Sequence, residues 1–238
     1  MKKIFIKEKL KNIDVKIEDI VLGDFDQIGE YTAKKNRTPD KDQYKSVGCF
    51  FRPNYERGIL QYYLTQKFNF KSVLEIGFGR GYSTFCIAKA MCDLGIDGEI
   101  TTVDPNLNEE FLNHLYKIFP KQWFEKINFI KSTSDDYYSK NPNKKFDFIY
   151  IDGDHRYDYV KKDWEYAKEN FNKIVLFDDY HMPTKNHKDI ECSKLIDEID
   201  DKEFNKELII MDRRIFFDDR RIKDEDIDYG QVLLERKI

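Results

Sequence analysis

The fold is decided by the stretch Val73-Leu74-Glu75-Ile76-Gly77-Phe78-Gly79-Arg80-Gly81-Tyr82-Ser83-Thr84. An apolar run leads into an acid and then into three glycines at alternate positions, which is typical of a strand that turns into a helix. Gly77, Gly79 and Gly81 leave the inner wall of such a turn without side chains, so the backbone can approach a bound nucleotide closely. The G-x-G-x-G spacing and the acid at Glu75 differ from the dinucleotide fingerprint G-x-G-x-x-G. A carboxylate at that position favours a cationic ligand over a pyrophosphate.

Strands alternate with helices along most of the chain, which predicts a parallel sheet with helices on both faces. We expect an α/β, Rossmann-like, doubly wound sheet of seven strands that is mostly parallel and has an antiparallel C-terminal strand. The expected strands are Ser72–Ile76, Glu99–Val103, Ile127–Lys131, Phe146–Ile151, Ile174–Phe177, Leu208–Met211 and Gln231–Leu234. The expected helices are Tyr55–Gln66, Tyr82–Leu94, residues 108–119, a short helix from Asp135, Tyr157–Asn170 and Lys188–Ile199.

Length and composition predict one domain with an N-terminal extension. The chain has 238 residues, of which 36% are charged, and its formal net charge of −4 gives no support to nucleic-acid binding. Residues 1–55 lack strong periodicity, and we expect them to form a lid or a partner contact, for example in a homo-oligomer. Residues 56–238 are expected to form the cofactor-binding domain. The sequence contains no apolar run of membrane-spanning length and no signal-peptide pattern, so we expect a cytoplasmic protein.

In a doubly wound sheet the ligand lies across the carboxyl ends of the strands, where this chain carries acidic or polar clusters. Asp104 follows the expected second strand and has two interpretations. Its carboxylate can accept hydrogen bonds from both ribose hydroxyls of a nucleotide, or it can cap the next helix, as Asp before Pro often does. The glycine turn upstream favours the ribose. Ser134 and Asp135 could hold an adenine through its amino group, but Ser-Asp is equally typical of a helix start.

Three carboxylates, Asp152, Asp178 and Asp179, follow two strands that we expect to be neighbours. Like charges so close would raise each other's pKa and destabilise the fold unless a cation lies between them. Oxygen ligands favour magnesium, manganese or calcium over zinc. The alternative is that these acids are solvated caps of the following helices, and one of the two adjacent acids is expected to point away from the other. Together with the glycine turn, the trio favours a divalent metal site.

The glycine-turn stretch resembles the first motif of class I S-adenosylmethionine (SAM) methyltransferases. The stretch Phe146-Asp147-Phe148-Ile149-Tyr150-Ile151-Asp152-Gly153-Asp154-His155-Arg156-Tyr157 is similar to the metal-dependent O-methyltransferases related to catechol O-methyltransferase. Within that group, I-D-G-D-H-x-Y and the pair Asp178-Asp179 resemble the branch of macrolide-sugar O-methyltransferases and cephalosporin-hydroxylase-like proteins. The resemblance covers about residues 70–182. It implies that residues 56–238 form a SAM-dependent methyltransferase domain.

The resemblance also implies roles for single residues. Those it assigns to SAM are Glu75, Gly77, Gly79, Gly81, Tyr82, Ser83, Asp104, Ser134, Asp135 and Asp152. Mg²⁺ or Mn²⁺ would be held by Asp152, Asp178 and Asp179. His155 would be the general base that takes the proton of the acceptor hydroxyl, and its alternative roles are to cap the next helix or to bond a backbone carbonyl. His181 is the second candidate for the base.

These observations predict a SAM-dependent, divalent-metal-assisted O-methyltransferase that acts on a hydroxyl of a small molecule, with a sugar or a glycoside as the first candidate. Two alternatives remain open. A nucleic-acid methyltransferase is disfavoured, because no N/D-P-P-Y/F tetrapeptide follows the fourth strand and no basic stripe occurs in the sequence. A SAM-binding protein without turnover fits the same residues, and it predicts SAM affinity with no effect of a metal or an acceptor.

Overall fold

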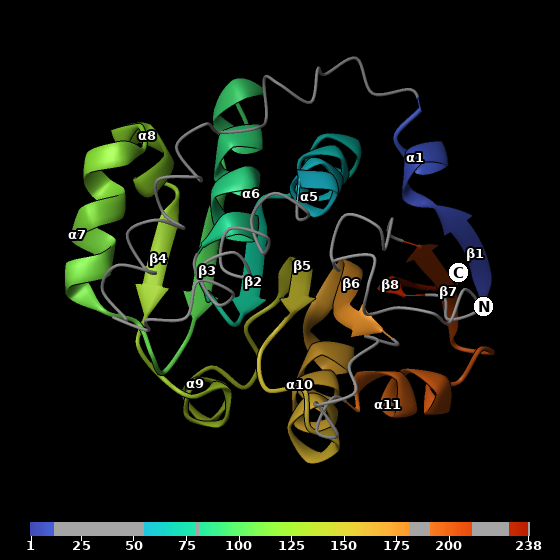
Figure 1. Ribbon diagram of the computed structural model, residues 1–238. Helices are drawn as coiled ribbons and strands as arrows, with labels where there is room; N and C mark the ends of the chain where they lie inside the picture. The colour runs from blue at the N-terminus through green and yellow to red at the C-terminus, as the bar shows by residue number, and fades with distance from the viewer. Residues whose placement is uncertain (12–54, 80, 181–190, 211–228, 238) are drawn as a thin grey trace, which may run out of the picture.

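The computed structural model describes residues 1–11, 55–79, 81–180, 191–210 and 229–237. The strands are β1 (Lys2–Phe5), β2 (Ser72–Ile76), β3 (Glu99–Val103), β4 (Ile127–Ile130), β5 (Phe146–Ile151), β6 (Phe171–Tyr180), β7 (Phe204–Ile210) and β8 (Gly230–Arg236). The helices are α1 (Ile6–Lys9), α5 (Tyr55–Phe68), α6 (Tyr82–Asp93), α7 (Glu109–Ile118), α8 (Lys121–Phe124), α9 (Ser134–Lys140), α10 (Tyr157–Asn170) and α11 (Cys192–Glu198). Figure 1 shows one central sheet, with α5 to α8 on one face and α9 to α11 on the other.

The sheet has eight strands in the order β1-β7-β8-β6-β5-β2-β3-β4. Neighbouring strands run parallel except at β8, which is antiparallel to both β6 and β7. The predicted Rossmann-like α/β fold with an antiparallel C-terminal strand is therefore confirmed. The sheet has one strand more than the seven expected, because β1 pairs with the edge of β7. β1 has only four residues and they are mostly exposed, so its sequence shows no buried alternation.

The N-terminal segment takes part in the sheet through β1, which lies at the same edge as β7 (Figure 1). Residues 12–54, where we predict a lid or a partner contact, lie outside the described residues, and so does His181. Those two hypotheses stay predictions. Among the helices of the described residues, none combines the length and the apolar character that a bilayer-spanning helix needs.

The strand order shows where a ligand can lie. From β2 the chain moves outward through β3 to β4, and β5 then pairs with the other side of β2 and leads on to β6. In such sheets the ligand crevice lies at the carboxyl ends of the strands where the order reverses. The reversal here falls between β2 and β5. Glu75 is the penultimate residue of β2 and Asp152 follows β5 directly, so the two predicted motifs meet at this crevice.

Two layers of apolar side chains hold the helices on the sheet. Phe148 and Tyr150 of β5 pack in the layer under α5 and α6, while Ile149 and Ile151 pack in the layer under α10. β5 is buried along its whole length, which explains its nearly continuous apolar sequence. The carboxyl end of β5 is thus anchored from both faces, and the acids beyond it stand on a rigid support.

β6 continues to Tyr180 instead of ending at Phe177 as predicted, so the two acids lie within the strand. Its pairing with β8 shifts register between Phe177 and Tyr180, and Asp179 has a φ of 52°, in the left-handed region. A regular strand would turn Asp178 and Asp179 to opposite faces. Because of the irregularity, both carboxylates contact the same side chain, Arg57 of α5. The expectation that one of the two acids points away is therefore wrong.

Candidate functional site

The glycine turn between β2 and α6 begins against the loop that follows β5. Gly77 has a φ of 94°, and a Cβ added there would overlap the carbonyl group of Asp152, whose carbon would be 2.6 Å away. Gly81 has a φ of 83°, and a Cβ added there would overlap the ring of Phe78, whose nearest carbon would be 2.6 Å away. A Cβ on Gly79 would meet no described atom within 4 Å. The protein's own atoms thus require glycine at two positions of the turn, whereas no described atom does so at Gly79.

The buried side chain of Glu75 stabilises the glycine turn through hydrogen bonds with hydroxyl groups. Its side chain is fully buried and accepts hydrogen bonds from the hydroxyls of Ser83, Thr84 and Thr102, the last at 2.6 Å. Burial raises the pKa of Glu75 to about 7, although the three hydroxyls favour the ionised form. The carboxylate therefore joins β2, β3 and the start of α6. Ser83, predicted as a cofactor residue, is one of its donors.

Asp104 stabilises the same turn by accepting hydrogen bonds from its backbone. Its Oδ2 accepts hydrogen bonds from the backbone N–H groups of Phe78 and Gly79, both at 3.1 Å, and its Oδ1 accepts one from Asn106 at 2.7 Å. The cap of α7 is Asn108, whose side chain accepts from two backbone N–H groups. Of the two interpretations, Asp104 is thus not the helix cap. Its predicted ribose role stays a prediction, at a position directly beside the glycine turn.

Ser134 and Asp135 form the first turn of α9, which Thr133 caps by accepting from the N–H of Asp136. Asp135 is exposed and pairs with Lys162 at 2.7 Å. The next helix, α10, carries the buried acid Asp163, which accepts from the Tyr138 hydroxyl at 2.8 Å and whose pKa burial raises to about 6. The helix start is therefore observed, and the adenine role stays a prediction. Tyr82, the first residue of α6, lies with its ring against Gly58 of α5.

Asp178 is the most enclosed of the three metal-ligand candidates, with 2% of its surface exposed. Its Oδ2 accepts from Arg57 Nη1 at 2.5 Å and from the Tyr150 hydroxyl at 3.0 Å. Its Oδ1 accepts from the Asp179 N–H at 2.8 Å and from Gln231 Nε2 at 3.2 Å. Every lone-pair direction of this carboxylate is used within the protein.

Arg57 supplies a positive charge to the cluster of acids, which the sequence left without a cation. The guanidinium also bonds Asp179 Oδ1 at 3.0 Å and stacks on the ring of Tyr229 at 5.4 Å. Burial alone would lower the pKa of Arg57, but the carboxylates of Asp178 and Asp179 raise it on balance. The negative charges of these two acids are therefore partly balanced by Arg57. This cation comes from a helix more than a hundred residues away in the sequence.

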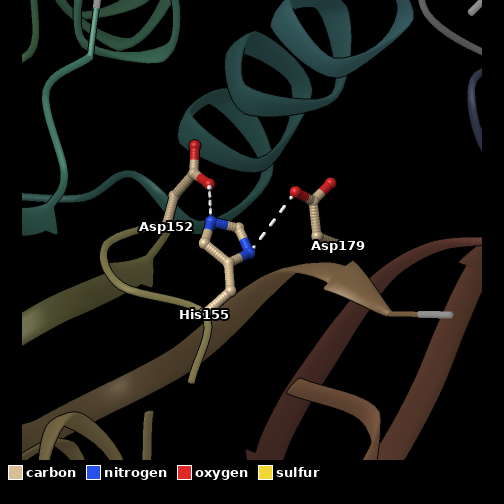
Figure 2. A group of neighbouring side chains, drawn as sticks. All are labelled: Asp152, His155 and Asp179. Atoms are coloured by element: carbon tan, nitrogen blue, oxygen red, sulfur yellow. Dashed lines mark ion pairs between the residues drawn. The ribbon is translucent and has the colours of Figure 1, made fainter. Parts of the chain in front are cut away.

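Asp152, His155 and Asp179 form a group in which one ligand atom from each lies within 4.8 Å of the others. The imidazole stands between the two acids, with Nε2 3.6 Å from Asp152 Oδ1 and Nδ1 3.4 Å from Asp179 Oδ2, as Figure 2 shows. Burial, together with Asp178 and Asp179, raises the pKa of Asp152 well above its ordinary value. Two carboxylates and an imidazole in this arrangement fit a divalent metal ion.

His155 is held from its backbone by the start of α11. Its carbonyl oxygen accepts from the N–H of Glu191 at 2.8 Å, and the thiol of Cys192 lies 3.6 Å from Nδ1. The cap position of α10 is Arg156, so His155 does not cap that helix, and the ring faces the acids instead of a carbonyl. The structure thus brings His155 to the predicted metal ligands, whereas Asp178 is not part of the described group.

Sequence reasoning missed four residues of this site: Arg57, Tyr150, Tyr229 and Gln231. The Tyr150 hydroxyl reaches Asp152 as well as Asp178, and Gln231 donates to that hydroxyl at 3.1 Å. Tyr150 could have been found, because a residue two before Asp152 in a strand lies on the same face. For the other three, on α5 and at β8, the sequence offered no signal, since they reach the site through long-range packing.

Comparison with known proteins identifies a domain within the chain and proteins of similar fold. Residues 74–180 match the family model described as a methyltransferase domain. The chain matches no curated protein. Its fold is similar to that of the O-methyltransferase from Bacillus cereus in complex with S-adenosylhomocysteine (SAH), with 14% identity over 98% of this chain and 97% of that one and a TM-score of 0.58.

Two further solved structures have the same fold. The O-methyltransferase TomG from Streptomyces achromogenes, in complex with SAM, is 14% identical over 91% of this chain and 99% of that one, with a TM-score of 0.56. The SAH-bound methyltransferase PaMTH1 from Podospora anserina is 16% identical over 92% and 89%, with a TM-score of 0.58. The chain therefore has the fold of SAM-dependent O-methyltransferases, and its residues 74–180 match a methyltransferase domain.

Proposed function

We propose that the chain is a SAM-dependent, divalent-metal-assisted O-methyltransferase that acts on a hydroxyl of a small molecule, with sugars and glycosides as the first acceptors to test. The match of residues 74–180 to a methyltransferase domain and the fold of its SAM- and SAH-bound neighbours support the methyl transfer. The I-D-G-D-H-x-Y stretch and the two acids at the end of β6 support the metal and the sugar.

One observation carries the proposal: Gly77 lies directly against the carbonyl group of Asp152. The predicted SAM turn and the acid–imidazole group are therefore two halves of one site and not two separate sites. A methyl donor on the glycine turn and an acceptor at the acids would thus be neighbours. Such proximity is the main requirement of a transfer in which the donor already carries an activated methyl group.

The chain's own residues supply binding and proton transfer. Glu75 and Asp104 hold the glycine turn through hydroxyl and amide hydrogen bonds. Asp152 and Asp179 would hold Mg²⁺ or Mn²⁺ through their carboxylate oxygens, with His155 beside the ion as the base, and such an ion would lower the pKa of an acceptor hydroxyl. The imidazole of His155, which lies between the carboxylates of Asp152 and Asp179, accepts the hydroxyl proton.

The test measures binding and turnover separately. SAM affinity is determined by titration calorimetry, and SAH release is then followed with a panel of sugars, glycosides and catechols, with Mn²⁺ or with a chelator. His155→Ala should lower turnover roughly 100- to 10,000-fold, the usual effect of a positioned base, with SAM affinity within about twofold of wild type. His114→Ala, on α7, is the matched histidine control and should leave turnover unchanged.

The outcomes separate the alternatives. SAM binding without SAH release, whatever the metal or acceptor, would support a binding protein without turnover. SAH release that is the same with Mn²⁺ and with a chelator would contradict the metal. Near-normal turnover of His155→Ala would assign the proton transfer to another group.

A further inference from the structure

The acid group has an uneven charge balance. Asp152, Asp178 and Asp179 carry three negative charges when ionised, and the guanidinium of Arg57 contributes one positive charge at hydrogen-bond distance from two of them. With a neutral imidazole at His155, two negative charges remain among these described side chains. That remainder is what one divalent cation neutralises, whereas three ligating carboxylates without Arg57 would exceed it.

The adjacent acids Asp178 and Asp179 have different sets of hydrogen-bond partners. Asp178 accepts two bonds on each oxygen, from Arg57 and Tyr150 on Oδ2 and from the Asp179 N–H and Gln231 on Oδ1. A carboxylate has about four such positions, so Asp178 has no oxygen left for a further ligand. Its side chain is 1% exposed, compared with 31% for Asp152.

Asp179 is held differently. Its Oδ1 accepts from Arg57 Nη2 and from the hydroxyl of Tyr229, both at 3.0 Å. Its Oδ2 faces the imidazole of His155 at 3.4 Å. Arg57 therefore binds one oxygen of Asp179 and leaves the other directed at the group formed with Asp152 and His155.

We propose that Arg57 is the internal counter-ion of the metal site: it pairs with Asp178, withdraws that acid from metal ligation and directs Oδ2 of Asp179 to the ion. The inference rests on the proposed divalent-metal site and specifies its ligands. Asp178 then acts on the ion through its charge and through Arg57 without binding it, and Arg57 is a positioning residue. Because it lies on α5, the affinity for the metal depends on how this helix packs on the sheet.

The test is a double-mutant cycle with Mn²⁺ as the probe. Binding is measured from the loss of the free-ion electron paramagnetic resonance signal in wild type, Arg57→Met, Asp178→Asn and the double variant. Removing the cation should tighten Mn²⁺ binding about tenfold or more, and removing the acid should weaken it by a similar factor, because each change alters the net charge beside the ion. The double variant keeps the net charge and should bind within about threefold of wild type.

A second interpretation, in which Asp178 is itself a ligand, predicts that the double variant binds Mn²⁺ as weakly as Asp178→Asn. That result would overturn the inference, as would unchanged Mn²⁺ affinity in Arg57→Met. If Arg57→Met fails to fold, the comparison of Asp178→Asn with the double variant still decides between the two. SAM titration and a melting curve verify that each variant is folded.

The inference and the proposed function can fail separately. Mn²⁺ binding by wild type with no change in the variants would overturn the role of Arg57 and leave the metal site intact. If no protein of the cycle binds Mn²⁺ while all bind SAM, the metal part of the proposed function fails and the role of Arg57 fails with it. The methyl-donor site would stand in both cases.

Discussion

Two corners of the crevice hold buried carboxylates in different ways. At the glycine-turn corner, Glu75 is bonded by hydroxyls from residues 8, 9 and 27 positions away in the sequence. At the acid corner, Asp178 is bonded by Arg57 and Gln231, which are 121 and 53 positions away. The first corner is a local construction on two βα units. The second depends on the packing of α5 and β8 on the sheet.

The two corners also differ in the charge of the groups that bond the buried carboxylates. Hydroxyl groups supply dipoles, and they do not offset the burial of Glu75, whose pKa rises to about 7. Near neutral pH this corner can be neutralised by a proton or by a cationic ligand, and the sulfonium and ammonium groups of SAM are cationic. The acid corner already contains a cation in Arg57. The negative charge that Arg57 leaves at this corner suits the divalent ion that we propose.

The largest effect is expected where the two corners touch. Gly77→Ala places a Cβ in the carbonyl group of Asp152 at a backbone φ of 94°. Overpacking and backbone strain together should lower the free energy of unfolding by about 3 kcal/mol or more, measured by urea denaturation. The clash is with the protein's own backbone, so stability falls even without ligand.

Gly79→Ala is the matched control for this prediction. It also has a positive φ, of 52°, but no atom of the described residues lies within 4 Å of the added Cβ. Strain alone should then cost about 1–2 kcal/mol. Equal losses in the two variants would mean that backbone conformation and not the contact with Asp152 makes glycine necessary, and the two corners would be less tightly joined than the structure shows.

The second prediction concerns the proton on Glu75. A pKa raised from 4.5 to about 7 means that the folded state binds a proton that the unfolded state has released. This contribution to stability is fully present below pH 4.5 and is lost as the pH rises to 7, about 3 kcal/mol in total. Glu75→Gln cannot titrate, so its free energy of unfolding should fall less over this range.

Urea denaturation at intervals from pH 4.5 to 7.5 measures the two slopes. Glu99→Gln, at an exposed position of β3, is the matched control and should leave the slope close to that of wild type. Identical slopes for wild type and Glu75→Gln would show that the three hydroxyls hold Glu75 ionised, and the contrast between dipoles and a formal charge would then disappear.

The glycine-turn corner could be predicted because its parts are close in sequence. Glu75, Gly77 and Ser83 lie in one strand–turn–helix, and Asp104 directly follows the adjacent strand, so alternation and spacing were enough to bring them together. The bounds of β2, β3, β5 and α10 are also those predicted.

The acid corner was only half predictable. Asp152 and Asp179 follow from strand ends, and His155 from its place in the same loop. Arg57 did not follow, since nothing in an amphipathic helix indicates which buried position contacts a strand end. The joint contact of Asp178 and Asp179 with Arg57 depends on an irregular pair of residues in β6, and such irregularities arise from the pairing with β8, not from the local sequence.

The smallest expected effect is at Asp104, where the glycine-turn corner can be loosened without a steric clash. Asp104→Ala leaves the N–H groups of Phe78 and Gly79 without their acceptor, so the turn loses its support and SAM affinity should fall by roughly 1–3 kcal/mol in titration calorimetry.

Asn108→Ala is the matched control: it also removes the acceptor of two backbone N–H groups, but at the start of α7. It should lower stability by about 1 kcal/mol and leave SAM affinity unchanged. Equal SAM affinities in the two variants would mean that the hydrogen bonds of Asp104 stabilise the fold only, and the methyl donor would have to be held by other parts of the crevice.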